Sequence, residues 1–186
     1  MDYFDIPLEN DLWQDFISLK NQPDIFKNYE NYFNTLVTWV KKHKSHIESI
    51  NHELLVSNRL DTVLDVDIEK YLSKNPEILL DMEIKRVFTR RPKTIDSLLM
   101  RIGDTLWELV RCHSGKDCPS CIDAELNYIL AEIRDTKQRK IVSECDTCGY
   151  AENLDGSKYA DEYADGYPVN DDDLAKYGVA KRLSTS

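Results

Sequence analysis

The sequence predicts a mostly α-helical protein, a helical bundle that carries a small zinc-binding module with one or two short strands near its C-terminus. Apolar residues recur at helical spacing along the chain as far as Val110. All five cysteines then lie between Cys112 and Cys148, and four of them form two Cys-x-x-Cys pairs. We therefore expect a helical bundle over residues 1–111, a four-cysteine zinc module over 112–150 and an acidic C-terminal segment over 151–186.

The bundle is predicted from amphipathic stripes and from signals at the helix ends. Asn21, Gln22 and Pro23 interrupt the first stripe, and Asn75 before Pro76 is a typical helix start. The stretch from Leu54 to Leu72 is less regular. We expect a helix there, although a short strand also fits its alternation. The expected helices cover residues 7–20, 23–50, 54–72, 76–91 and 94–110.

The two cysteine pairs predict a metal site. Zinc prefers a tetrahedron of four ligands, and one Cys-x-x-Cys turn places two thiolates on the same ion, so two turns complete the shell. Four thiolates leave no open position, which is typical of a structural site and not of a catalytic one. The predicted ligands of a structural Zn²⁺ are Cys118, Cys121, Cys145 and Cys148.

Between the two pairs we expect a helix over residues 122–137, because Leu126, Ile129, Leu130 and Ile133 are helix-spaced. A short strand should follow from Arg139 to Glu144. The run Cys145-Asp146-Thr147-Cys148-Gly149 resembles the knuckle of zinc-ribbon and rubredoxin-like modules, where the glycine permits a left-handed turn. The resemblance covers about 35 residues. The first pair departs from it, because Ile122 follows Cys121.

Other chemistry remains open at this site. Cys118 and Cys121 are spaced like a thioredoxin-type redox pair, although a helix and not a strand is expected before them. Four cysteines can also hold iron. Cys112 and His113 are spare, and either one is able to replace a ligand.

Negative charge is concentrated after the second pair. The formal net charge of the 186 residues is −10, and residues 144–173 alone hold ten acidic residues against one lysine. Tyrosines are interleaved with these acids, which favours a docking surface for a basic protein, although a solvated acidic tail has the same composition. The expected contact residues are Asp155, Tyr159, Asp161, Glu162, Tyr163, Asp165 and Tyr167.

These features predict a binding protein and not an enzyme. An acidic chain repels nucleic acid, so we expect no nucleic-acid partner. No signal peptide or membrane-length apolar run is apparent, and paired reduced thiols fit the cytoplasm. In size and acidity, and in lacking a recognisable catalytic motif, the chain is similar to bacterial immunity proteins. That resemblance implies a toxin inhibitor whose partner is a basic toxin such as a nuclease.

Two other function classes stay open. One is a zinc-ribbon adaptor or transcription-related protein, for which Lys137, Arg139 and Lys140 are the candidate basic contacts. The other is a thiol redox or metal-dependent enzyme that uses Cys118 and Cys121.

Overall fold

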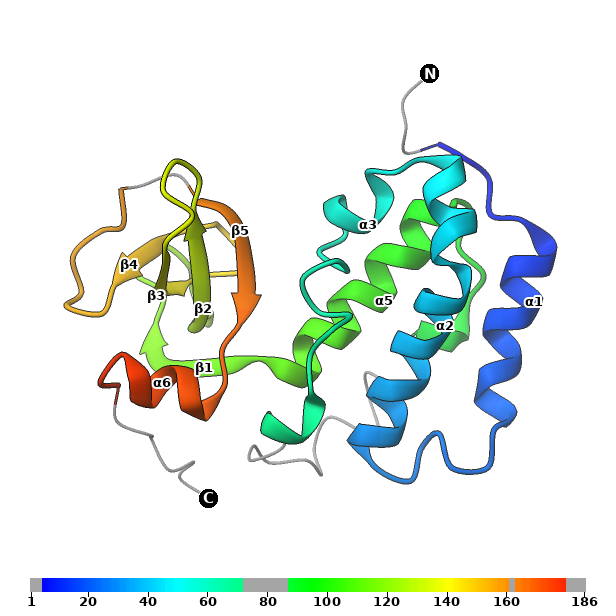
Figure 1. The fold of residues 1–186 in the computed structure, drawn as a ribbon, viewed down its shortest axis with the longest axis horizontal. Coiled ribbons are helices and arrows are strands. Elements are labelled where there is room, and N and C mark those ends of the chain that lie inside the picture. The colour runs from blue at the N-terminus through cyan, green and yellow to red at the C-terminus, as the bar shows by residue number, and fades with distance from the viewer. Residues whose placement is uncertain (1–4, 72–86, 161–162, 180–186) are drawn as a thin grey trace. The chain divides into compact units, whose positions relative to one another are not determined.

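The computed structural model describes residues 5–71, 87–160 and 163–179, with the side chains of residues 163 and 164 left undescribed. The chain divides into two compact units, residues 1–109 and 110–186 (Figure 1). The elements of the first unit are α1 (Asn10–Ser18), η1 (Leu19–Asn21), α2 (Tyr29–Ile50), α3 (Leu54–Ser57), η2 (Ile68–Lys70) and α5 (Ile95–Val110). None of the helices in these described ranges combines the length and the apolar character that crossing a bilayer requires.

Aromatic packing forms much of the core of the N-terminal unit. Phe16 on α1 is fully buried, with its ring centroid 4.9 Å from those of both Trp39 and Phe88. The indole N–H of Trp39 donates to the Asp15 carboxylate at 2.9 Å, and this carboxylate also accepts from Lys42. These contacts join α1 to the middle of α2. The hydrogen bond from Lys42 is the main reason that the pKa of Asp15 is lowered.

The predictions for the N-terminal unit are confirmed at some elements and wrong at others. Helix α5 covers the expected range, and α2 begins later than expected because Asn28 caps it by accepting from the N–H of Asn31. The helix expected over residues 54–72 is wrong, since within the described part of that range, residues 54–71, only Leu54–Ser57 and Ile68–Lys70 are helical. Most of the helix expected over residues 76–91 lies outside the described residues.

Gly103 lies at a close approach between α5 and the segment after α3. A Cβ atom at this position would lie 2.4 Å from the backbone oxygen of Asn58. The side chain of Asn58 is held from two directions, because its amide donates to the oxygen of Leu54 at 2.8 Å and to the Asp96 carboxylate at 3.0 Å. The backbone around Asn58 therefore has little freedom to move away.

Gly103→Ala is therefore expected to destabilise the protein, although alanine favours a helix over glycine by about 1 kcal/mol. Overpacking against a fixed backbone costs about 1–3 kcal/mol, which outweighs that gain. Denaturant unfolding followed by tryptophan fluorescence measures the change. Met100→Ala, at an exposed position of the same helix, is the control and should have little effect. A more stable Gly103→Ala variant would show that the helix and the Asn58 segment separate easily.

In its described residues, the C-terminal unit is a five-stranded antiparallel sheet with one helix, so the prediction of a mostly α-helical bundle is wrong (Figure 1). Strand β2 is central. It pairs with β3 along one edge, while β1 and β5 share its other edge, β1 beside residues 125–128 and β5 beside residues 129–133. The elements are β1 (Cys112–Asp117), β2 (Glu125–Ile133), β3 (Arg139–Glu144), β4 (Ala151–Asn153), β5 (Tyr163–Pro168) and α6 (Asp171–Lys176).

The helix expected over residues 122–137 is also wrong, because β2 occupies this stretch. Leu126, Ile129 and Leu130 are all buried, although consecutive residues of a strand face opposite sides of the sheet. A strand covered on both faces gives a nearly continuous apolar run, which is easily mistaken for a buried helix. Strand β3 lies over the predicted residues.

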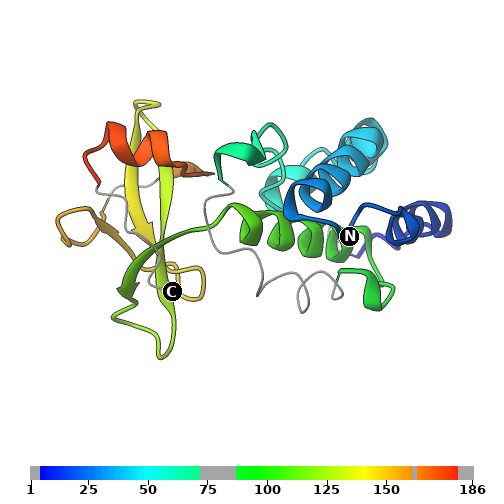
Figure 2. The same ribbon diagram turned by 90° about the horizontal axis from the view of Figure 1, so that it is seen from below.

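Helix α6 covers part of one face of the sheet (Figure 2). Its Leu174 packs in one buried cluster with Leu130 and Ile141. Asn170 caps the helix by accepting from the N–H of Asp173, whose carboxylate accepts from the N–H of Asn170 in return. This capping box fixes the start of the helix, and its sequence signal is an asparagine followed by three acidic residues.

Candidate metal centre

Both Cys-x-x-Cys pairs lie in hairpin turns at the same end of the sheet. Cys118 and Cys121 are in the turn between β1 and β2, and Cys145 and Cys148 are in the turn between β3 and β4. The pairing of Asn127 with Glu144 places the start of β2 beside the end of β3. The turn before β2 and the turn after β3 are therefore neighbours, and strand register brings the two pairs together.

Backbone hydrogen bonds close each turn. In the second turn, the N–H of Gly149 donates to the oxygen of Cys145 at 2.9 Å, and Gly149 has a φ of +69°. In the first turn, the N–H of Cys118 donates to the oxygen of Ala124 at 2.7 Å. The left-handed position is taken there by Asp123, with a φ of +58°, a conformation that aspartate tolerates better than most residues. This explains how the first turn forms without the expected glycine.

The four cysteines Cys118, Cys121, Cys145 and Cys148, named here the cysteine cluster, are positioned to hold a metal ion. Their sulfurs all lie within 4.8 Å of one another. The Sγ atoms of Cys118 and Cys148 are 3.6 Å apart, and those of Cys145 and Cys121 are 3.9 Å apart. Four thiolates at about 2.3 Å from a central zinc ion have sulfurs about 3.8 Å apart. Both measured separations lie close to that edge length and far from the length of a disulfide bond.

The pKa values of the thiols in the cysteine cluster favour the binding of a cation. Burial would raise the pKa of Cys145, but hydrogen bonds from the backbone N–H groups of Cys148 and Thr147 outweigh it and lower that pKa to about 7. The neighbouring thiol of Cys148, together with burial, raises the pKa of Cys121 to about 12. Without a cation, Cys121 therefore stays protonated at neutral pH. A divalent ion supplies the positive charge that four thiolates need, and its binding releases protons.

A charged contact anchors the second turn. The carboxylate of Asp146, between the two cysteines of that turn, accepts from Arg111 at 2.7 Å and from the side-chain amide of Asn127 at 3.1 Å. Asn127 lies on β2, next to the first turn. The contact therefore fixes the loop that carries Cys145 and Cys148 to the strand that follows Cys118 and Cys121.

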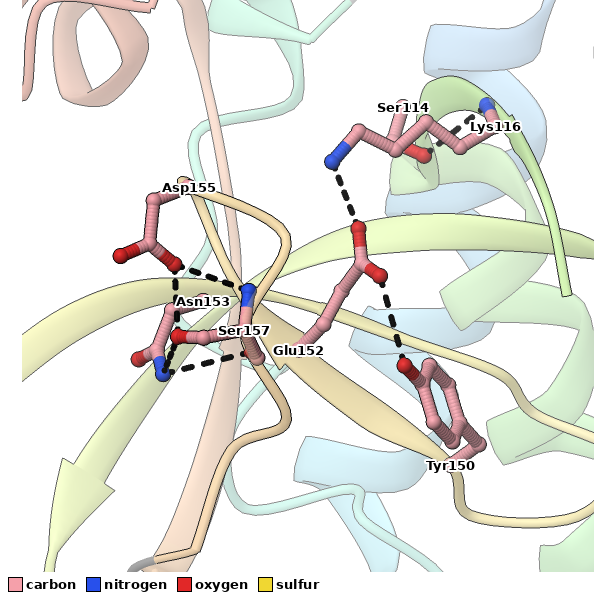
Figure 3. A network of polar contacts seen from close by, with 7 residues as sticks. All are labelled: Ser114, Lys116, Tyr150, Glu152, Asn153, Asp155 and Ser157. Atoms are coloured by element: carbon pink, nitrogen blue, oxygen red, sulfur yellow. Dashed lines mark hydrogen bonds and ion pairs between the residues drawn. The ribbon is translucent and has the colours of Figure 1, made fainter. Parts of the chain in front are cut away.

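A second polar contact joins the two hairpins from their outer strands (Figure 3). Lys116 on β1 donates to the carboxylate of Glu152 on β4 at 2.6 Å. The other oxygen of this carboxylate accepts from the hydroxyl of Tyr150 at 3.5 Å, and Tyr150 packs against Cys118 and Cys145. The side chain of Glu152 is only 10% exposed and that of Lys116 is 38% exposed, so the carboxylate of the pair is shielded from solvent. Both hairpins that carry the cysteines are tied together in this way.

No family model, curated protein or solved structure matches the chain. The resemblance to immunity proteins therefore has no support from any family. The knuckle resemblance holds at the level of the cysteine cluster itself.

The two spare residues lie outside the cysteine cluster. Cys112 is buried in the cluster of side chains under α6, among them Leu130 and Val169. His113 points its Nδ1 atom at the carboxylate of Glu125, 3.1 Å away. In the part of the chain that the structure describes, neither belongs to the group that could hold an ion.

The predicted docking residues are not one exposed group. Tyr159 is buried, so it is not available as a surface contact. Tyr167 is covered by the guanidinium of Arg139, which lies 4.0 Å from its ring centroid. Asp161 and Glu162 lie outside the described residues, and Tyr163 is described only as part of β5.

The two remaining predicted residues have different surroundings. Asp155 accepts from the hydroxyl and the N–H of Ser157, at 2.6 and 2.9 Å, and so shapes the turn after β4 (Figure 3). Those hydrogen bonds lower its pKa. Asp165 is partly exposed on β5.

Two of the three basic residues that are candidate nucleic-acid contacts are partly compensated by an acid. Lys137 and Arg139 both contact the carboxylate of Glu132, at 3.5 and 3.2 Å. Their charge is therefore shared with an acid on the neighbouring strand, which weakens the case for a phosphate-binding surface at this hairpin.

Sequence reasoning missed the residues that support the cysteine cluster, namely Arg111, Lys116, Asn127 and Glu152. Only Asn127 had a visible signal, a polar amide inside the otherwise apolar run from Leu126 to Ala131. A buried polar side chain needs a partner, and here the partner is Asp146.

Proposed function

We propose that the chain is a zinc-stabilised protein-binding protein whose C-terminal unit docks on a basic protein partner. The observation that carries the metal part is the arrangement of four sulfurs at separations near the edge of a zinc tetrathiolate tetrahedron. Four thiolate ligands fill the coordination shell. The ion therefore serves to hold the two hairpins together and does not activate a substrate.

The negative charge of the chain supports the proposal of a basic protein partner. The net charge of the chain is −10, and a dication bound by four thiolates adds a further negative charge of about 2 at one end of the sheet. Several acids are already occupied, because Asp146 and Glu152 form ion pairs and Asp173 caps α6. Asp165 on β5 and Asp172 on α6 hold no ion pair within the described residues. They are the acids that we assign to docking.

The test compares two doubly neutralised variants. A basic partner is first captured from the native host with the zinc-loaded chain, identified by mass spectrometry and purified. Asp165→Asn with Asp172→Asn should lower its association rate several-fold at low salt and much less at high salt, because steering is screened. Asp11→Asn with Glu69→Gln removes the same charge from exposed positions of the N-terminal unit and is the control.

Three results would contradict the docking surface. They are an association rate independent of salt, equal rates for the two double variants, and capture of nucleic acid in place of a basic protein. Capture of a basic nuclease whose activity the chain blocks would identify the partner as a toxin.

A further inference from the structure

Cys148 differs from the other three members of the cysteine cluster in its exposure. Cys118 and Cys145 are 4% and 1% exposed, and Cys121 is intermediate, whereas Cys148 is exposed. It lines a surface hollow of about 410 Å³ together with Ser120, Tyr150 and Lys158. Cys148 is therefore the member of the cysteine cluster that is most open to a soluble reagent.

Hydrogen bonding distinguishes Cys148 from Cys118 and Cys145 as well. The sulfur of Cys118 accepts from the N–H of Ser120 at 3.4 Å, and that of Cys145 accepts from the N–H groups of Thr147 and Cys148. Across the described residues, no such bond reaches the sulfur of Cys148 or that of Cys121, and of these two Cys148 is the exposed one. The sulfur of Cys148 lies 3.6 Å from that of Cys118 and within 4.8 Å of the other two. Because N–H donors draw electron density from a thiolate, an exposed sulfur without them is the better nucleophile.

We propose that Cys148 is a modification site, a metal-bound thiolate that reacts with hydroperoxides and other soluble electrophiles and thereby releases the ion. This rests on the proposed metal function, since the ion keeps Cys148 as a thiolate at neutral pH. The function of the site then includes a response to oxidants in addition to holding the fold.

Cys118 completes the reaction. The thiolate of Cys148 attacks one oxygen of the hydroperoxide, so that an S–O bond forms, the O–O bond breaks, and the alcohol leaves after taking a proton. The thiolate of Cys118, 3.6 Å away, then attacks the sulfur of the resulting sulfenic acid. An S–S bond forms, and the hydroxide leaves as water after taking a second proton. The two sulfurs together supply the two electrons that reduce the peroxide.

The disulfide links the two turns and removes two of the four ligands. Cys121 and Cys145 alone cannot complete a tetrahedral shell, so the affinity for the metal falls sharply. A thiol reductant restores both thiols, which makes the change reversible.

The experiment uses the full zinc-loaded chain with less than one equivalent of hydrogen peroxide. Mass spectrometry maps the oxidised cysteines, and a coloured zinc chelator measures the released ion. We expect Cys118–Cys148 to be the first disulfide, with one ion released for each disulfide. Cys112, buried outside the cluster, should stay reduced and serves as the internal control.

First oxidation at Cys112, or a first disulfide between Cys121 and Cys145, would overturn the proposal, as would oxidation without metal release. A purified chain that binds no metal would instead overturn the proposed function, and this inference with it.

A second measurement tests the hollow without touching a ligand. Lys158 should attract anionic reagents to Cys148. The quantity to measure is the rate of alkylation of Cys148 by iodoacetate, which is anionic, divided by its rate with iodoacetamide, which is neutral. This ratio should be higher in the wild type than in Lys158→Gln. We expect the ratio of the two rates to fall about twofold to threefold in that variant. Lys137→Gln removes the same charge on the turn at the other end of β2 and should leave the ratio unchanged. Equal ratios in all three proteins would show that Cys148 does not react through the hollow.

Discussion

Replacing Cys145 with serine is expected to lower the affinity for zinc by more than about 100-fold, because losing a ligand should exceed the roughly 10- to 100-fold effect of losing a hydrogen bond to one. Cys145 is 1% exposed and packs with Cys118 and Leu126, so the change also affects the interior of the C-terminal unit. Metal binding and folding are coupled in small metal-bound folds. We therefore expect this unit to lose its fixed structure together with the ion.

Metal analysis and Co²⁺ substitution measure the effect. Wild-type protein should hold one ion per chain and, with Co²⁺, show the absorption of a tetrahedral tetrathiolate, which the variant should lack. Cys112→Ala is the matched control, since it removes a buried cysteine outside the cluster and should keep the ion. A wild-type chain without metal, or a variant that binds zinc as tightly as the wild type, would refute the structural site. Iron in place of zinc would keep the site and change only its occupant.

The cysteine cluster could be predicted because its signal is local. Two cysteines separated by two residues meet within one turn whatever the rest of the fold does. The spacing of Cys118 to Cys121 and of Cys145 to Cys148 is therefore sufficient to predict two half-sites. Helix α5 and the start of α6 were predictable for the same reason, since helix caps and the spacing of apolar residues are signals that lie within a few residues of each other.

The sheet was not predictable in the same way. Strand β1 buries Cys112 and Ser114, small residues that give no apolar alternation. Strand β4 has only three residues, and β5 contains Gly166 and Pro168, which are unfavourable in strands. Pairing between distant segments forms these strands, and intrinsic propensity contributes little.

The contacts that support the cysteine cluster depend on the same distant pairing. Asp146 finds Arg111 and Asn127 only because β2 and β3 are in register. For the same reason, charge composition alone does not show which of the predicted docking residues also have a role within the fold. Asp155 holds a turn, and Tyr159 is buried.

Phe16→Ala should have the largest effect on the N-terminal unit. Phe16 is fully buried, and its ring contacts Trp13, Trp39 and Phe88. Truncating a buried phenylalanine removes its transfer free energy and leaves a cavity, which together cost about 3–5 kcal/mol. Three aromatic neighbours on separate segments cannot all move into the space. We therefore expect a value near the upper end of that range.

The chain offers separate probes for this effect and for the metal effect. All three tryptophans, Trp13, Trp39 and Trp107, belong to the N-terminal unit, and the metal site belongs to the C-terminal one. Phe16→Ala should thus shift the denaturant midpoint of tryptophan fluorescence and leave the zinc affinity unchanged. Cys145→Ser should lower the zinc affinity and leave that midpoint unchanged. Phe16→Leu, which keeps most of the volume, should cost less than about 1.5 kcal/mol. If Phe16→Ala also released the metal, the two units would unfold as one cooperative body, and each substitution would report on the whole chain.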